Sequence, residues 1–133
     1  MIFLDTAALV KLVRVEPESQ ALISWLTDHG SEPLAASALV EVELPRALRR
    51  SEPRVLGGVA PVIARLHRFE IDTAVRATAG AYADPSLRSL DAIHLATAEM
   101  LQASGQQITA FVTYDKRLAS AATAVGLPVV APD

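Results

Sequence analysis

The sequence predicts an α/β fold in which helices cover both faces of a parallel β-sheet. Short apolar runs with the length of buried strands alternate with longer segments of helical periodicity, an order typical of such sheets. The 133 residues, of which 51% are apolar, are enough for one packed domain, which we place over 1–133. Acidic residues also stand at the ends of several apolar runs, where open α/β sheets bind their ligands.

The N-terminal half is predicted to contain three strands and four helices. The segment 16–18, with Pro17 at its centre, separates the first two helices, and Gly30 suits the end of the second. Ser37 is expected to cap the third helix, and Pro45 inside that helix predicts a kink. The expected elements are strand 2–5, helices through 9–13 and 19–29, strand 34–36, helices through 39–48 and 53–66, and strand 69–71.

The C-terminal half is predicted to alternate helices and strands up to the end of the chain. Asp72 is expected to cap its first helix, and the strongest helical pattern closes at Gly105. The last strand is placed at an edge of the sheet, because Pro128 has no N–H for a central ladder. The expected elements are helix 73–83, turn 84–86, helix 89–104, strand 108–113, a helix through 115–125 and strand 127–130.

Charge and composition exclude several classes of protein. The net charge is −3 and the pI about 5.6, so the chain lacks the basic character of a typical DNA-binding domain, and a nucleic-acid contact would need a local patch. Without cysteine, neither disulfides nor thiolate metal sites can form. The first residues lack the basic start of a signal peptide and no apolar run matches a membrane span, so we expect a cytoplasmic protein.

Four acidic residues carry the functional prediction: Asp5, Glu43, Asp91 and Asp115. Taken alone, each has an ordinary explanation as a helix cap, a first-turn charge or a solvated helix position, and Glu41 competes with Glu43. Together they predict one crevice, because strand ends and helix starts of such a sheet meet at a common edge. Carboxylates gathered there repel one another unless a divalent cation binds them, which indicates metal-dependent chemistry.

Two further polar residues accompany these acids. His94 lies three residues after Asp91 on the same face of the expected helix. Its ring could orient Asp91, but a single histidine more often packs or caps, so both interpretations stay open. Thr113 lies two residues before Asp115 and shares its direction across the pleat of the expected strand.

Five segments carry a resemblance to a known family: IFLDT at 2–6, SALVEVEL at 37–44 with RAL at 46–48, LDAIHLATA at 90–98, VTYDKRL at 112–118 and GLPVV at 126–130. In these segments, which extend over essentially the whole chain, the sequence resembles the PIN-domain family and, within it, the VapC-type toxins of bacterial type II toxin–antitoxin systems. The resemblance implies a three-layer α/β/α fold with a five-stranded parallel sheet in the order 3-2-1-4-5. In that order, strands one and four are neighbours, which places Asp5 beside Asp115.

The resemblance also implies a ribonuclease that depends on Mg²⁺ or Mn²⁺. The family pattern places its second acid six residues after Ser37, which selects Glu43 over Glu41. We expect Glu43 to orient or deprotonate the attacking water. Because water and not the RNA 2′-hydroxyl is the nucleophile, cleavage would leave a 5′-phosphate and a 3′-hydroxyl. The expected metal ligands are Asp5 and Asp115 directly and Asp91 directly or through water, with Thr6, Ser37 and Thr113 as candidates for supporting hydrogen bonds.

Three kinds of partner follow from the resemblance. They are an RNA substrate, a second copy in a homodimer, and a cognate VapB-like antitoxin that would give a heterotetramer or a larger assembly. No membrane contact is expected. Transfer, ribosomal and messenger RNA all stay open as targets, and so do one or two metal ions. The basic side chains expected to contact RNA or antitoxin are Arg46, Arg49, Arg50 and Lys116.

Two alternative functions are weighed against this prediction. A non-catalytic PIN-like module that binds RNA or a partner is the main alternative, and the presence of all four acids argues against it. A phosphotransferase with an aspartyl-phosphate intermediate would also use an aspartate after a strand. Such enzymes typically carry an Asp-x-Asp-x-Thr pattern, whereas this chain has Ala7 at the second acidic position.

Overall fold

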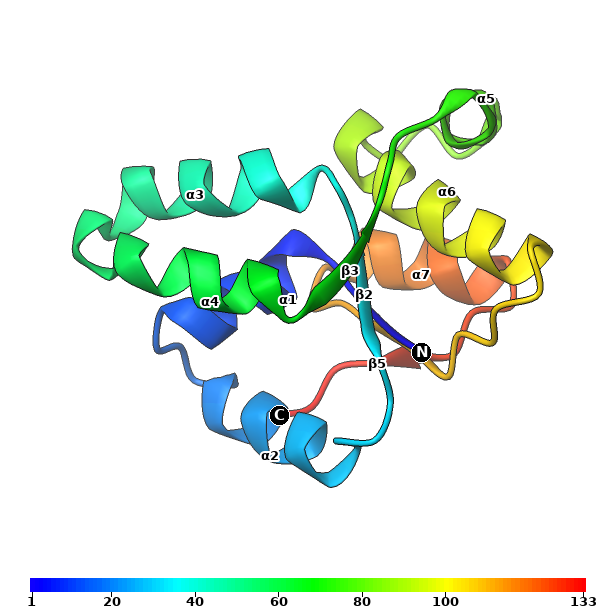
Figure 1. The fold of residues 1–133 in the computed structure, drawn as a ribbon. Helices are drawn as coiled ribbons and strands as arrows, with labels where there is room; N and C mark the ends of the chain where they lie inside the picture. The colour runs from blue at the N-terminus through cyan, green and yellow to red at the C-terminus, as the bar shows by residue number, and fades with distance from the viewer.

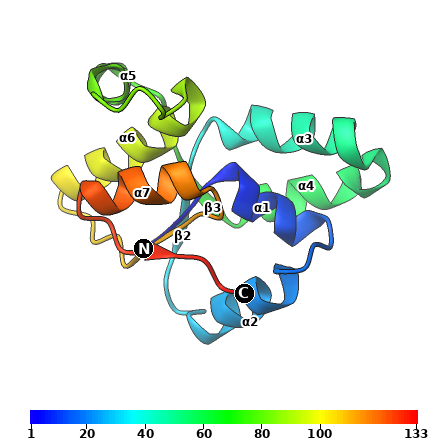
Figure 2. The same cartoon turned by 180° about the vertical axis from the view of Figure 1, so that it is seen from behind.

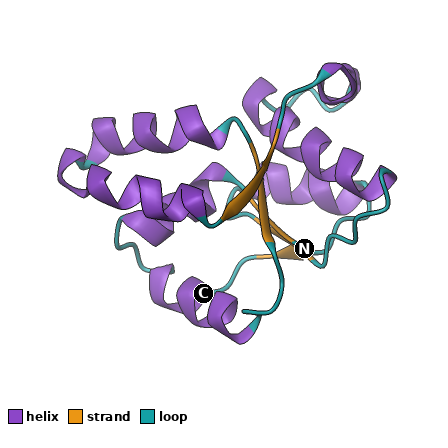
Figure 3. Cartoon of the chain, in the orientation of Figure 1, coloured by secondary structure: helices purple, strands orange, loops and turns teal.

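A five-stranded sheet lies at the centre of the protein, in a computed structural model that describes residues 1–133. The strand order is β3-β2-β1-β4-β5, and every pair of neighbouring strands is parallel. Helices cover both faces (Figures 1 and 3). The predicted α/β fold with its 3-2-1-4-5 sheet is therefore confirmed. The elements are β1 (Ile2–Leu4), α1 (Thr6–Val13), α2 (Ser19–Asp28), β2 (Leu34–Ser37), α3 (Val40–Ser51), a 3-10 helix η1 (Pro53–Gly58), α4 (Val59–Ala64), β3 (Leu66–Phe69), α5 (Thr73–Ala81), α6 (Ser89–Ala103), β4 (Ala110–Val112), α7 (Lys116–Ala124) and β5 (Val129–Val130).

Strand β1 is central because its side chains supply both faces of the sheet. Ile2 and Leu4 belong to one cluster of buried apolar side chains, and Phe3 belongs to a second cluster on the opposite face. Strand β4 repeats this alternation, and Phe3 stacks on Phe111 with ring centroids 5.4 Å apart. Such a strand can only be an inner one, since all three of its side chains are excluded from water.

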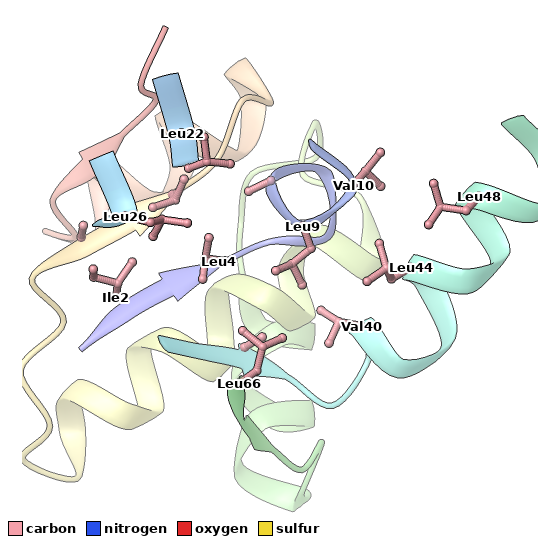
Figure 4. Close-up of a cluster of buried hydrophobic side chains, with 14 residues drawn as sticks. Ile2, Leu4, Leu9, Val10, Leu22, Leu26, Val40, Leu44, Leu48 and Leu66 are labelled. Atoms are coloured by element: carbon pink, nitrogen blue, oxygen red, sulfur yellow. The ribbon is translucent and has the colours of Figure 1, made fainter. Parts of the chain in front are cut away.

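The first apolar cluster joins the sheet to α1, α2 and α3. Figure 4 shows side chains from these three helices and from β1 and β3 meeting in one core. Helix α3 contributes Val40, Leu44 and Leu48, whose spacing places them on one face of a helix. Residues of η1 and α4 are partly buried against the same cluster. Helix α3 therefore fills part of this core, whereas η1 and α4 cover it with side chains that stay partly exposed.

The second cluster lies under α6 and α7. Leu95, Leu101 and Leu118 are its largest helical members, and they pack on Phe3 and Phe111. Helix α5 packs against α6 at the outer side of this layer (Figure 1). Helices α1 and α7 leave the sheet toward opposite faces (Figure 2). No helix in the structure is long and apolar enough to cross a membrane.

Two differences from the prediction matter most, at β3 and at Ser37, and the helix expected over 53–66 is divided into η1 and α4. Strand β3 begins at Leu66 and ends at Phe69, whereas the sequence pattern placed it at 69–71. Leu66 continues the helical periodicity of the preceding segment, but it is buried and pairs with Leu34 in the sheet. Ser37 is the last residue of β2 and not the cap of α3: its hydroxyl accepts a hydrogen bond from the Leu39 N–H at 3.1 Å.

Candidate active site

Asp5 and Asp115 lie side by side at the carboxyl edge of the sheet. Leu4 pairs with Val112 across β1 and β4, so the residues that follow these two strands emerge together. Asp5 caps α1 by accepting the Ala8 N–H at 2.8 Å, and Asp115 caps α7 by accepting the Leu118 N–H at 2.9 Å. The capping and the site interpretations of these two acids are therefore compatible.

Asp5 is the most buried acid of the group, with 3% of its surface exposed. Burial raises the pKa of Asp5, and the nearby negative charge of Asp91 adds to this rise. The hydrogen bonds from Thr113 and from the Ala8 N–H lower the pKa but do not cancel the effect of burial. Thr113 donates to Asp5 Oδ2 at 2.5 Å and accepts the Asp115 N–H at 3.2 Å. One hydroxyl thus fixes the two neighbouring acids relative to each other.

Asp91 approaches this pair from α6, and an arginine bridges it to Asp115. The Arg88 Nε donates to Asp91 Oδ2 at 3.3 Å, and the Arg88 Nη2 lies 3.5 Å from Asp115 Oδ2. Arg88 is the N-cap residue of α6, and 67% of its side chain is exposed. An exposed ion pair of this kind is weak and can exchange with solvent or with another cation.

Glu43 joins the site from α3 through a network with Thr6 and His94. The Thr6 hydroxyl donates to Glu43 Oε1 at 2.6 Å, and His94 Nε2 lies 2.7 Å from the same oxygen. Burial works against ionisation of Glu43, but the hydrogen bonds from His94 and Thr6 outweigh it and lower its pKa. The imidazole of His94 contacts Glu43 and Thr6, and not Asp91 as the spacing along α6 had allowed.

The structure separates Glu43 from Glu41. Glu41 points away, where it forms an exposed ion pair with Arg68 of β3 at 2.9 Å. Glu43 lines the same cleft as Asp5, Asp91 and Asp115. The two glutamates are two positions apart on a helix, and so they face different directions.

The four acids line one open cleft of about 610 Å³. Basic side chains form part of its wall: Lys11, Arg14, Arg46, Arg50 and Arg88. Lys11 and Arg14 are bound to Glu16, and Lys11 also to Glu18, so their charge is largely neutralised within the protein. Arg46 and Arg50 are exposed and form no ion pair in the structure, which leaves them free for an anionic ligand.

Four of the predicted residues lie outside the wall of this cleft, and one of them, Thr113, is buried behind Asp5 and Asp115. Ser37 is fully buried at the end of β2, and its hydroxyl accepts a hydrogen bond from the Leu39 N–H. Arg49 and Lys116 are exposed but do not line the cleft. Helix positions advance by about 100° per residue, which places Arg49 about 120° around α3 from Glu43, whereas Arg46 and Arg50 lie within about 60° of Glu43. The contact between His94 and Glu43 was not predicted, since it joins residues 51 positions apart that only the fold brings together.

The donor set suits a divalent cation. Carboxylate oxygens are the ligands that Mg²⁺ prefers, and Asp5 is a buried carboxylate close to the charge of Asp91, an arrangement that a cation would stabilise. In the conformation of the structure, no three acidic or imidazole groups stand at the spacing of a coordinated ion, and Arg88 lies against Asp91 and Asp115. A cation that used both of these carboxylates would displace Arg88.

The fold and the acidic cleft define the class of this protein, and comparison with known proteins agrees. Residues 2–124 match the PIN domain, and the chain belongs to the PIN-domain family. Within it, the chain is a VapC ribonuclease toxin of a toxin–antitoxin system. It is 57% identical over 132 residues to ribonuclease VapC35 of Mycobacterium tuberculosis, and the alignment covers 99% of this chain and 97% of that protein.

Solved structures of more distant sequence share the fold. The crystal structure of VapC20 from Mycobacterium tuberculosis, described as a toxin that cleaves the sarcin–ricin loop, superposes with a TM-score of 0.71 at 19% identity and covers 99% of this chain and 100% of that one. The VapBC2 complex from Rickettsia felis, bound to a DNA fragment of its promoter, matches with a TM-score of 0.66 at 14% identity and covers 100% of both chains. At these identities, the likeness establishes the fold.

Proposed function

We propose that this ribonuclease hydrolyses RNA with the help of Mg²⁺ or Mn²⁺ held by Asp5, Asp91 and Asp115, and that Glu43 handles the attacking water. The observation that carries the proposal is the convergence of the four acids, from four separate segments of the chain, on one cleft. A cation at this site would make a water molecule easier to deprotonate and would offset the negative charge of the scissile phosphate. Hydrolysis by water leaves a 5′-phosphate and a 3′-hydroxyl.

The protein's own groups divide the remaining work. Glu43 is half-buried and its pKa is lowered, so it is ionised at neutral pH and can accept a hydrogen bond from a water molecule. Thr113 orients Asp5 and Thr6 orients Glu43. Both threonines come from segments that flank β1 and β4, so they fix the acids to the rigid centre of the sheet.

The RNA backbone would approach along α3. Arg46 and Arg50 lie one helical turn apart and face the cleft, and each offers a forked donor for phosphate oxygens. Lys11 and Arg14 are less available, because Glu16 binds both of them. These arginines would give a protein of net charge −3 a local positive surface on which a polyanion can bind.

A cognate VapB-like antitoxin and a second copy of the toxin are the partners that we propose. Support comes from the structural neighbours, two of which are VapBC complexes from Rickettsia felis and Salmonella typhimurium. We place the protein in the cytoplasm, with its RNA substrate.

Substitution of Asp91 by Asn tests the proposal. The change keeps the shape of the side chain and removes its charge, so RNA cleavage in Mg²⁺ or Mn²⁺ and growth arrest should both be lost. Cleavage sites in total RNA, mapped by sequencing of the 5′-phosphate ends, provide the measurement. Asp28→Asn on the exposed face of α2 is the matched control and should cleave like the wild type. Undiminished cleavage by the Asp91 variant would contradict the proposed site.

A further inference from the structure

The buried histidine of α6 is neither an expected metal ligand nor the group that handles the attacking water. His94 is 2% exposed, and its two ring nitrogens have very different surroundings. Nε2 lies 2.7 Å from Glu43 Oε1 and 3.3 Å from the Thr6 hydroxyl oxygen. Nδ1 is buried and has no hydrogen-bond partner. A histidine that served the fold would be expected to satisfy both nitrogens.

The geometry around Glu43 fixes which nitrogen of His94 carries the proton. An ionised carboxylate can only accept hydrogen bonds, so Nε2 must be the protonated nitrogen that donates to Glu43 Oε1. Thr6 donates to the same oxygen at 2.6 Å. Glu43 Oε1 therefore receives two donors, whereas Glu43 Oε2 forms no hydrogen bond within the protein. One oxygen is fixed and the other is left open in a side chain that lines the cleft.

We propose that His94 is a positioning residue that, together with Thr6, clamps one oxygen of Glu43 so that the other oxygen, Oε2, faces the attacking water. This inference rests on the proposed role of Glu43 and adds its orientation. A glutamate on a helix has three rotatable bonds, and a loosely held carboxylate would present either oxygen in several directions. Donors from two elements, α1 and α6, remove that freedom before the substrate binds.

The matched pair His94→Gln and His94→Asn provides the test. Both are neutral amides, but only the Gln side chain places an N–H donor as many bonds from the backbone as Nε2. With an RNA oligonucleotide that contains a mapped cleavage site, the Asn variant should lose roughly 10- to 100-fold in kcat with little change in KM, as for other residues that orient a reactive group. The Gln variant should recover most of kcat.

A second readout uses the metal-free wild-type protein. The nitrogen chemical shifts of its imidazole rings, measured by long-range ¹H–¹⁵N spectroscopy, should show the Nε2–H tautomer for His94. Because Nδ1 contributes no hydrogen bond to the fold, the Gln variant should melt near the wild type, and the Asn variant, which also loses the bond from Nε2, should melt at a lower temperature. If both variants unfold, the tautomer decides: Nδ1–H would overturn the inference, and Nε2–H would support it.

Two results would overturn the role of His94 without touching the proposed function. One is full kcat in the Asn variant while Asp91→Asn remains inactive. The other is an equal loss in the Gln and Asn variants, which would show that the N–H donor is not what matters. Activity in Asp91→Asn would instead remove the proposed function itself.

Discussion

At the scale of the residue, Asp5 is held in place by hydrogen bonds that favour its charged form, but it is buried, which disfavours that form. Its carboxylate caps α1 and accepts a hydrogen bond from Thr113, but burial keeps its pKa above the ordinary value of 3.8. A buried carboxylate with a raised pKa destabilises the folded state when it is ionised. The position of Asp5 therefore suits the proposed cation site, at a cost to the stability of the metal-free protein.

Asp5→Asn should raise the melting temperature of the metal-free protein. Asn still caps a helix, but it has no charge to bury. The penalty of wild-type Asp5 is absent well below pH 3.8, grows as the pH rises from 3.8 to the raised pKa and is constant above it, so the difference between variant and wild type should increase with pH above 3.8. Each kcal/mol regained is worth roughly 4 °C in a domain of this size.

Thermal denaturation in EDTA and in excess Mg²⁺ provides the measurement. The wild type should gain stability from Mg²⁺ by mass action, and the variant should gain less. A variant that melts below the wild type in EDTA would contradict this account of Asp5.

Arg88 should compete with the cation for Asp91 and Asp115. Its guanidinium lies 3.3 Å and 3.5 Å from their oxygens. Arg88→Gln should therefore tighten Mg²⁺ binding by about two- to fivefold, the range expected for removal of exposed ion pairs. Calorimetric titration of Mg²⁺ measures the change, and Arg117→Gln, exposed and outside the cleft wall, is the control. Weaker Mg²⁺ binding in the Arg88 variant would exclude competition.

At the scale of the element, α3 carries two functions on two faces. Val40, Leu44 and Leu48 enter the core, and the charged side chains that α3 contributes to the cleft are Glu43, Arg46 and Arg50. The positions of these charged residues differ by three and four, the spacing of one helix face. The helix thus holds Glu43, which we propose handles the attacking water, at fixed separations from the arginines that would bind phosphate.

Charge reversal along α3 should weaken RNA binding. Arg46→Glu and Arg50→Glu, combined with Asp91→Asn to prevent cleavage, should each lower the affinity for a single-stranded RNA. Each should also reduce the salt dependence of binding, with a slope smaller by roughly 0.7 for every phosphate that the variant no longer neutralises. Fluorescence anisotropy at several salt concentrations measures both quantities. Arg49→Glu changes the charge equally but lies outside the cleft wall, and should have the smaller effect. Equal effects of all three would place the RNA elsewhere.

The elements themselves could be predicted where local patterns are unambiguous. Strand β1, with its apolar run and following acid, and α6, with its long periodic segment, are found close to where the sequence places them. Strand β3 could not be placed, because Leu66 fits the helical period before it and its burial is decided by pairing with Leu34. A boundary of this kind depends on the tertiary fold and not on local preference.

In the candidate site as well, some features could be predicted from local sequence and others depend on the fold. The acids at strand ends are readable, because the parallel topology brings such ends together. The choice of Glu43 over Glu41 stays open from helix geometry alone, and the spacing from Ser37 in the family pattern made it. The clamp formed by His94 could not be predicted, because it depends on how α6 packs in the fold.

At the scale of the whole molecule, two apolar clusters are separated by the sheet, and β1 contributes to both. The neighbours of β1 are β2 and β4, which follow it by very different lengths of chain. Pairing between β1 and β4 joins residues 2–4 to residues 110–112. Long separations of this kind slow folding and make the centre of the sheet a late event.

The order of the strands has a consequence for how the toxin is made. On a translating ribosome, Asp5 emerges first and Asp115 only about 110 residues later, so the acidic edge of the sheet cannot form on a chain that ends before β4. We expect ribosome-bound chains that end before residue 110 to leave RNA uncut, and chains extended by a linker beyond residue 133 to cut it. Cleavage of an added RNA by the two kinds of arrested complex measures this. The order of the strands alone would thus keep the toxin inactive while the ribosome makes it. An antitoxin could then bind the chain once it is released.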